Sequence, residues 1–320
     1  MTAHPKPVLL PRLRTLMIML LALVLPVALS GTAAADGGKS SRTWTVQVGS
    51  ESSDQAIQGM SFLPRNIYIN AGDEVTWEAN SAEIHTVTFL AAGQTIESTQ
   101  PFNPFSPLYV SKQGGTSYDG HSYYNSGVMS NVSNSGFAEV SSYTLKFPDA
   151  GDFTYYCLVH GAGQKGIVHV RAKGTEYPFT QEQYNNRVER AERAIIRDGY
   201  KQWSEARDQA DDNTVFAGAD DGVAMVMRFI EPKVVIHVGE KVSFVNNGMG
   251  APHTVTFGAE PANPLPPLGD PTNYTGGQLN SGILLPGATF TVTFNKAGVY
   301  DYICALHDYM GMVGKVVVEE

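Results

Sequence analysis

The strongest constraint on how this chain folds is an internal repeat. Residues 152–160 read DFTYYCLVH and residues 299–307 read VYDYICALH, while IHTVTF at 84–89 recurs as PHTVTF at 252–257. The only two cysteines of the chain lie in these segments. Each cysteine belongs to its own His…Cys-x2-His set, so we expect two metal sites and no disulfide bond.

The repeat extends into the scaffold around these segments. Residues 63–77 match residues 230–244, and both stretches alternate apolar and polar residues, which is typical of strands. A further strand and an Ala-Gly turn precede each cysteine. The sequence therefore predicts an all-β fold with two tandem Greek-key β-sandwich domains.

The long segments between these strands are rich in Pro, Gly, Ser, Asn and Tyr. Their details also recur in order, with PFNP at 101–104 matching PANP at 261–264, and NSG at 125–127 matching NSG at 280–282. Repetition at this level of detail favours ordered loops over low-complexity linkers.

The repeated ligand set points to one kind of metal chemistry. Two imidazoles and one thiolate in a trigonal arrangement, with a weak axial ligand, form the blue-copper electron-transfer site. In the second copy, four residues separate His307 from Met312, which stands where a soft axial ligand is expected.

The second copy resembles the cupredoxin family, specifically plastocyanin and pseudoazurin. The resemblance is carried by Pro-His-Thr-Val at 252–255, Cys-x2-His-x4-Met at 304–312 and Gly-Lys-Val at 314–316. It implies one type 1 copper in each domain. The copper ligands that it implies in the second domain are His253, Cys304, His307 and Met312, and the corresponding residues of the first copy are His85, Cys157 and His160.

The first copy departs from the family pattern at the axial position. No methionine follows His160, and aligning the next strands places Gln164 opposite Met312. Glutamine is a known axial ligand in such sites, whereas the ammonium of Lys165 has no lone pair. We interpret Gln164 as the axial candidate, and the alternative is a decayed site that keeps the fold but holds metal poorly.

The resemblance also implies roles for neighbouring residues. Thr86 and Thr254 follow the upstream histidines, where a hydroxyl or backbone amide can approach the cysteine sulfur. His160 and His307 would be partly exposed and pass the electron. The second of these histidines would be surrounded by an apolar docking patch of Met249, Pro252, Tyr309 and Met310.

The main rival is an enzyme, because multicopper oxidases and copper nitrite reductases are also built from repeated cupredoxin domains. Their catalytic copper typically uses His-x-His pairs, and this chain has none. Apart from His4 of the leader, only His121, His169 and His237 remain to form a catalytic copper between subunits. A second rival is a copper buffer or delivery protein.

A helix is predicted between the two domains. Thr180 and Gln183 fit a capping box, and Tyr184, Val188, Ala191 and Ile195 then follow at helical spacing over roughly 180–209. This amphipathic helix either fixes the two sites relative to each other or packs on one domain. The predicted boundaries are a signal peptide at 1–35, a first domain at 36–174, a helical linker at 175–213 and a second domain at 214–320.

The N-terminus predicts export. Basic residues, an apolar run and Ala-Ala-Ala before Asp36 are the layout of a signal peptide, and the run is too short to favour a membrane span. Cleavage would leave 19 Lys and Arg against 31 Asp and Glu, a formal net charge of −12, which argues against nucleic-acid binding. We expect a periplasmic, cell-surface or extracellular protein whose partners are a redox protein donor and acceptor.

Overall fold

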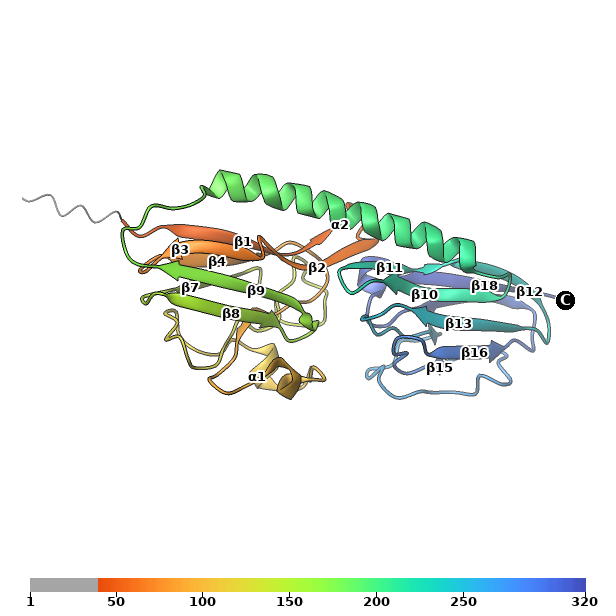
Figure 1. Ribbon diagram of the computed structural model, residues 1–320. Helices are drawn as coiled ribbons and strands as arrows, with labels where there is room; N and C mark the ends of the chain where they lie inside the picture. The colour runs from red at the N-terminus through yellow and green to blue at the C-terminus, as the bar shows by residue number, and fades with distance from the viewer. Residues whose placement is uncertain (1–39) are drawn as a thin grey trace, which may run out of the picture. The chain divides into compact units, whose positions relative to one another are not determined.

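The structure, a computed structural model, describes residues 40–320, so the predicted signal peptide lies outside the described residues. Strands dominate this range, and one long helix, which follows the first domain in the sequence, runs along both domains (Figure 1). Within residues 40–320, no helix combines the length and the apolar character needed to cross a membrane.

The first domain contains nine strands. They are β1 (Thr43–Glu51), β2 (Ile57–Leu63), β3 (Asn66–Asn70), β4 (Glu74–Ala79), β5 (Thr88–Phe89), β6 (Tyr124–Asn125), β7 (Ser142–Lys146), β8 (Gly151–Cys157) and β9 (Gly161–Arg171). A 3-10 helix η1 (Ile96–Thr99) and a short helix α1 (Pro107–Val110) lie in the long loop between β5 and β6.

The second domain repeats this order and also contains nine strands. They are β10 (Thr214–Asp220), β11 (Ala224–Ile230), β12 (Lys233–His237), β13 (Lys241–Asn247), β14 (Thr256–Phe257), β15 (Leu279–Asn280), β16 (Thr289–Thr293), β17 (Gly298–Ile303) and β18 (Val313–Glu319). The 3-10 helix η2 (Asp308–Met310) follows the second Cys-x2-His segment.

Each domain is a sandwich of two layers. In the first domain, strands β2-β1-β4-β7 face the five-stranded sheet β3-β9-β8-β5-β6. In the second domain, β11-β10-β13-β16 face β12-β18-β17-β14-β15. The predicted all-β class and the two tandem sandwiches are confirmed.

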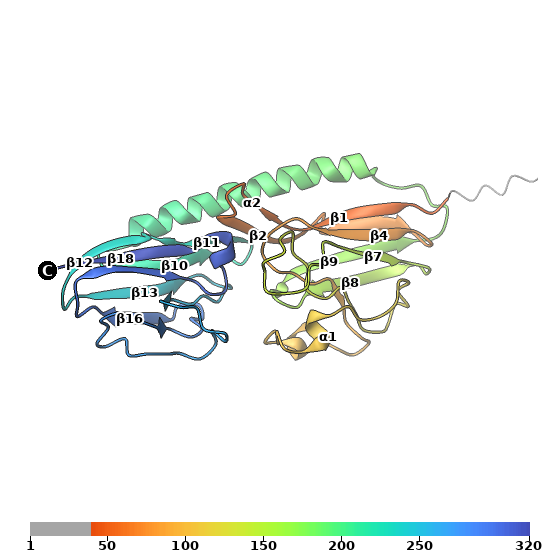
Figure 2. The same ribbon diagram turned by 180° about the vertical axis from the view of Figure 1, so that it is seen from behind.

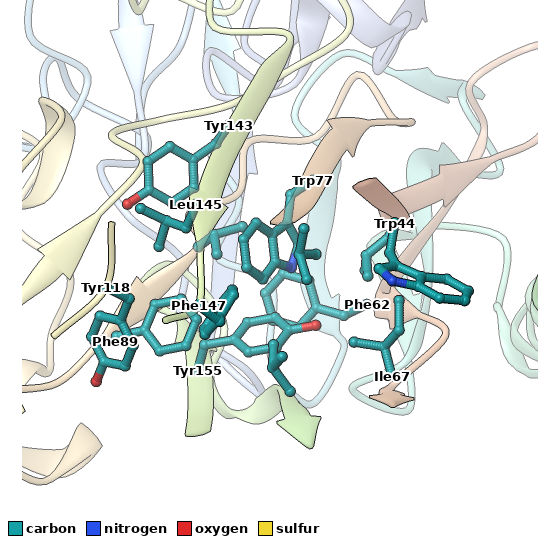
Figure 3. Packing of buried hydrophobic residues seen from close by; sticks show 14 of the residues in the cluster. Trp44, Phe62, Ile67, Trp77, Phe89, Tyr118, Tyr143, Leu145, Phe147 and Tyr155 are labelled. Atoms are coloured by element: carbon teal, nitrogen blue, oxygen red, sulfur yellow. The ribbon is translucent and has the colours of Figure 1, made fainter. Parts of the chain in front are cut away.

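Equivalent aromatic rings fill the two cores. In the first core, Trp77 lies with its ring centroid 5.8 Å from Phe89 and 5.2 Å from Tyr155 (Figure 3). Phe244 takes the corresponding place in the second core, with two aromatic centroids at 6.0 and 5.1 Å. These separations are typical of packed aromatic pairs, so each domain has its own core.

The two domains are joined edge to edge by strand pairing. Strand β2 pairs antiparallel with β11, with Ile57 opposite Val226 and Gly59 opposite Ala224. The two half-sheets thereby form one eight-stranded sheet in the order β16-β13-β10-β11-β2-β1-β4-β7. This pairing satisfies the backbone groups of two edge strands that would otherwise be exposed.

Helix α2 (Gln181–Gln209) lies across this joined sheet (Figures 1 and 2). The predicted capping box is present, because the Thr180 hydroxyl accepts from the Gln183 amide and the Gln183 side chain accepts from the Thr180 amide. The helix contacts β1 and β2 of the first domain and β10 and β11 of the second. The alternative of a connector packed on one domain is therefore wrong.

The long loops are tied to the strands by the same contacts in both domains. The Asn125 side chain accepts from the Thr88 hydroxyl at 3.1 Å and donates to the Leu108 carbonyl at 2.9 Å. Asn280 makes the equivalent pair with Thr256 and Pro264. The prediction of ordered loops is confirmed.

Candidate metal centres

The second domain brings together three of its predicted ligands. His253 lies just before β14, Cys304 directly follows β17, and His307 precedes η2. The Nδ1 atoms of the two histidines are 3.1 Å apart, and they lie 3.8 and 3.4 Å from the Cys304 sulfur. Met312 is fully buried in the same core cluster as Cys304, and its carbonyl accepts a 3.0 Å hydrogen bond from the Cys304 amide.

The first domain builds the same arrangement around Cys157. Its sulfur lies 4.0 Å from His85 Nδ1 and 3.3 Å from His160 Nδ1. Gln164 is 1% exposed and directs its Oε1 between the two rings, 3.0 Å from one Nδ1 and 2.9 Å from the other. Lys165 is exposed, which is consistent with its rejection as an axial candidate.

These donor sets fit a trigonal metal. Bonds of about 2.0 Å to imidazole nitrogen and about 2.3 Å to thiolate sulfur place the donor atoms of such a set about 3–4 Å apart. The observed separations in both domains lie in that range. In the first site, the buried Gln164 Nε2 has no hydrogen-bond partner within the described residues, so only the oxygen of this amide is engaged.

The surroundings of both cysteines favour the thiolate, which is the metal-binding form. Burial raises the pKa of the Cys157 thiol, but the facing rings of His160 and His85 outweigh burial and hold this pKa well below its usual range. The pKa of Cys304 is lowered in the same way, with His307 and His253 outweighing burial.

The threonines after the upstream histidines orient the sulfurs, as predicted. The Thr86 amide donates to the Cys157 sulfur at 3.4 Å, and the Thr254 amide donates to the Cys304 sulfur at 3.3 Å. Each threonine hydroxyl also accepts from the backbone amide that follows the cysteine, at 2.8 and 2.7 Å. Both contacts fix the strand ends that carry the ligands.

A glycine in each domain makes room for the upstream histidine. Gly49 and Gly218 adopt φ of +77° and +75° at a register shift in β1 and β10. A Cβ at these positions would come within 2.6 Å of His85 Nε2 and 2.5 Å of His253 Nε2. Both the positive φ and the close approach require glycine.

The expectation of partly exposed outer histidines is wrong for His307, which is buried, whereas His160 is half-buried. The His160 and His307 side chains are only 11% and 7% exposed, and both face Glu83, which lies in the domain of His160 and across the junction from His307. The predicted docking patch is exposed only in part. Met249 and Pro252 are exposed, whereas Met310 is 2% exposed and the Tyr309 hydroxyl donates to the Ala82 carbonyl across the junction. Met310 belongs to a methionine-rich interdomain cluster of Met60, Ala82, Met225, Met227, Ala251 and Met310.

Two polar residues of the sites, Ser81 and Glu83, were not predicted from the sequence. Ser81 Oγ lies 2.9 Å from His85 Nε2, so it fixes the orientation of that ring. Glu83 is 4% exposed and lies between His160 and His307. A difference between the two repeats could have indicated Glu83, because this residue corresponds to Ala251 at the position two residues before the upstream histidine.

The charges of these groups reinforce one another. Burial raises the pKa of Glu83, but His160 and His307 outweigh it and lower this pKa to about 2. Burial lowers the pKa of His160, whereas Cys157 and Glu83 raise it to about 10. The pKa of His307 is also raised, because Cys304 and Glu83 outweigh burial.

The three remaining histidines of the described chain are engaged elsewhere. His121 is exposed and contacts Asp119, His169 Nδ1 lies 2.7 Å from Asp152, and His237 Nδ1 lies 3.1 Å from the C-terminal residue's carbonyl oxygen. Within residues 40–320, the only groups of three or more candidate metal ligands are the two His-Cys-His sets.

Comparison with known proteins identifies similar proteins for both repeats. The family described as copper binding proteins of the plastocyanin/azurin family matches residues 48–171 and 214–319. A chloroplast plastocyanin of Chlamydomonas reinhardtii is 39% identical over 108 residues, which cover 34% of this chain and 68% of that protein. A plastocyanin of Solanum crispum is 35% identical over 104 residues, which cover 32% of this chain and 97% of that protein.

Solved structures of single domains are also similar to part of the chain. A copper(I) form of an amicyanin mutant is 28% identical, and the match covers 35% of this chain and 89% of the amicyanin chain with a TM-score of 0.24.

Proposed function

Because this chain belongs to the plastocyanin/azurin family of copper-binding, electron-transfer proteins, we propose that it carries single electrons through one type 1 copper in each domain. Copper held by two imidazoles and one thiolate supplies one-electron chemistry at each site. The proposed ligands are His85, Cys157, His160 and Gln164 in the first domain, and His253, Cys304, His307 and Met312 in the second.

The observation that carries this proposal is the convergence of both imidazole Nδ1 atoms on a buried thiolate sulfur in each domain. The amide of the threonine after the upstream histidine donates to that sulfur, and rigid strands hold the cysteine. A rigid donor set suits electron transfer, because it limits rearrangement between the two oxidation states of the metal.

The two sites are proposed to differ in reduction potential. An amide oxygen is a harder ligand than a thioether and favours Cu(II), so Gln164 should give the first site a lower potential than Met312 gives the second. Electrons would then move from the first domain toward the second. Potentiometric titration of each site separately tests this, and an equal or higher potential at the first site would contradict it.

The proposal extends to compartment and boundaries. We propose an exported protein whose mature part begins near residue 36, with domains at 36–174 and 214–320 joined by the helical linker at 175–213. Its donor and acceptor are proposed to be redox proteins. An electron carrier is favoured over an enzyme because the family model that matches both repeats is that of the plastocyanin/azurin copper-binding proteins.

The decisive experiment is a copper titration of the mature protein, read by visible absorption and electron spin resonance. Cys157→Ser and Cys304→Ser variants are titrated in parallel. Two blue equivalents, each lost with its own cysteine, are expected. A single blue equivalent lost only with Cys304 would overturn the two-site proposal, and a further non-blue copper with turnover of oxygen or nitrite would indicate an enzyme.

The same preparation separates an electron carrier from a copper buffer. The copper-loaded protein is mixed with a small one-electron reductant and then with an oxidised redox protein in a stopped-flow instrument. Rapid bleaching and recovery of the blue bands is expected. Tight copper binding without electron exchange would instead support a buffer or delivery role.

A further inference from the structure

Glu83 lies between two histidines that belong to different metal sites. Its Oε1 is 3.6 Å from His160 Nε2 and its Oε2 is 3.8 Å from His307 Nε2. The same two rings present Nδ1 to the sulfurs of Cys157 and Cys304, at 3.3 and 3.4 Å. One carboxylate therefore faces the outer nitrogen of one proposed copper ligand in each domain.

The burial of this carboxylate needs a compensating interaction. Glu83 is 4% exposed, and its Oε2 accepts no hydrogen bond within the described residues. A buried charge is destabilising unless other charges or hydrogen bonds compensate it, and the groups that face this carboxylate are the Nε2 atoms of two proposed copper ligands. A centre with one thiolate and neutral imidazoles has a formal charge of +1 as Cu(II) and zero as Cu(I), so Glu83 interacts favourably with the oxidised state of both sites.

The position of Glu83 is not a consequence of the repeat. The Ala82 and Gly250 amides donate to equivalent carboxylates, those of Glu51 and Asp220, which fixes the alignment of the two segments. Glu83 then corresponds to Ala251, which is buried in the interdomain cluster. The junction thus contains one acid for two histidines, where the repeat alone would give an acid in both domains or in neither.

The two rings are largely covered at the junction. Their side chains are 11% and 7% exposed, and the Tyr309 hydroxyl donates to the Ala82 carbonyl across the junction. The residue that each outer histidine faces is therefore Glu83, and beyond it lies the histidine of the other site.

We propose that Glu83 couples the two copper sites, so that one electron passes within the molecule between them through His160, Glu83 and His307. This inference rests on the proposed function, because it needs copper in both domains. The step oxidises Cu(I) in one domain and reduces Cu(II) in the other, and no covalent bond forms or breaks. Glu83 acts as a positioning residue that orients both rings and stabilises the oxidised state of both sites.

The test begins by counting blue copper in the wild-type protein. Fewer than two equivalents would refute the proposed function and not the role of Glu83.

The fully oxidised two-copper protein is then reduced by less than one equivalent with a radiolytic pulse. The movement of the electron is followed in the two blue bands, whose reference spectra come from the Cys157→Ser and Cys304→Ser variants. We expect a redistribution rate that does not depend on protein concentration, and a rate proportional to concentration would overturn the proposal.

Two variants test the residue itself. Glu83→Gln keeps the shape and removes the charge, and Glu83→Ala introduces the residue found in the second repeat. Both variants are expected to slow the movement of the electron between the sites several-fold and to shift both midpoint potentials upward. The control is Glu97→Gln, at an exposed position of the first domain, which should leave the rate and the potentials unchanged. Wild-type rates and potentials in a two-copper Glu83→Gln protein would refute the coupling.

A measurement without copper covers the case in which these variants load poorly. Imidazole nitrogen resonances of the metal-free protein are compared between the wild type and Glu83→Gln. Shifts at Nε2 of both His160 and His307 are expected, with His237 unchanged as an internal control. A shift at only one ring, or at neither, would contradict a shared positioning role.

Discussion

At the scale of single residues, the two sites differ most at the axial position. Gln164 Oε1 lies within 3.0 Å of both histidine Nδ1 atoms, and its Nε2 has no hydrogen-bond partner among the described residues. Replacing this side chain with methionine therefore breaks no side-chain hydrogen bond of the amide nitrogen. We expect Gln164→Met to raise the potential of the first site toward that of the second.

The measurement uses a Cys304→Ser background, so that only the first site gives a blue band. The potential is read by titration with redox mediators and compared with that of Lys165→Met in the same background. Lys165 is exposed and adjacent, so its replacement should leave the potential unchanged. An unchanged or lower potential in Gln164→Met would exclude Gln164 as the axial ligand.

Thr254 illustrates a structural contribution at the same scale. Its buried hydroxyl accepts a 2.7 Å hydrogen bond from the Ala305 amide. Thr254→Val keeps the shape and leaves that amide unsatisfied, which should lower the free energy of unfolding of the copper-free protein by about 1–3 kcal/mol. Urea denaturation measures this, and Thr291→Val on an exposed strand position is the control. Equal losses in both variants would mean that the loss is a general effect of replacing threonine by valine and not of this buried hydrogen bond.

The proposed ligands could be identified from the sequence, whereas the residues that face their outer nitrogen atoms could not. A short Cys-x2-His segment keeps its members together wherever it lies in the fold, so Cys304 and His307 could be paired by spacing alone. Glu83 meets His307 across 224 positions of sequence only because the two domains dock. The pattern of side chains along the sequence does not predict how the two domains dock, because the docking depends on which strand edges pair.

At the scale of elements, the joined sheet and helix α2 hold the domains together. Gly199 is buried on the helix face, and a Cβ there would overlap the side chain of Ile57 on β2. The absence of a side chain at this position therefore sets how closely the helix approaches the junction.

We expect Gly199→Val to destabilise the protein by about 1–3 kcal/mol, because overpacking forces the helix and strand apart. Valine is a better helix former than glycine, so any loss measured is a lower limit on the packing effect. Thermal and urea unfolding measure it, with Ala194→Val at an exposed position of the same helix as control. A stabilised Gly199→Val protein would show that the helix is not closely packed at this point.

The elements were predictable to different degrees for a physical reason. Helix α2 begins as predicted because a capping box and a 3.6-residue period are local signals. The pairing of β2 with β11 depends on backbone groups that every strand offers, so nothing in the side chains of Ile57 or Val226 marks them as partners. The copper sites of the two domains could thus be predicted separately but not together.

At the scale of the whole molecule, the shared sheet, the shared helix and the methionine-rich interdomain cluster make the domains interdependent. Damage to one core should therefore lower the stability of the other site. Phe244 is fully buried in the second core, far in sequence from Cys157 and outside the first domain. Phe244→Ala should lower the free energy of unfolding of its own domain by about 3–5 kcal/mol.

If the junction transmits this loss, the blue band of the first site disappears at a lower temperature in Phe244→Ala than in the wild type. The first site is observed alone in the Cys304→Ser background, and the second domain is followed in parallel by near-ultraviolet circular dichroism. Phe105→Ala, at a 73% exposed position of the first domain, should leave both transitions in place. A first site that melts at its wild-type temperature while the second domain unfolds early would mean that edge pairing and helix α2 connect two independent folding units.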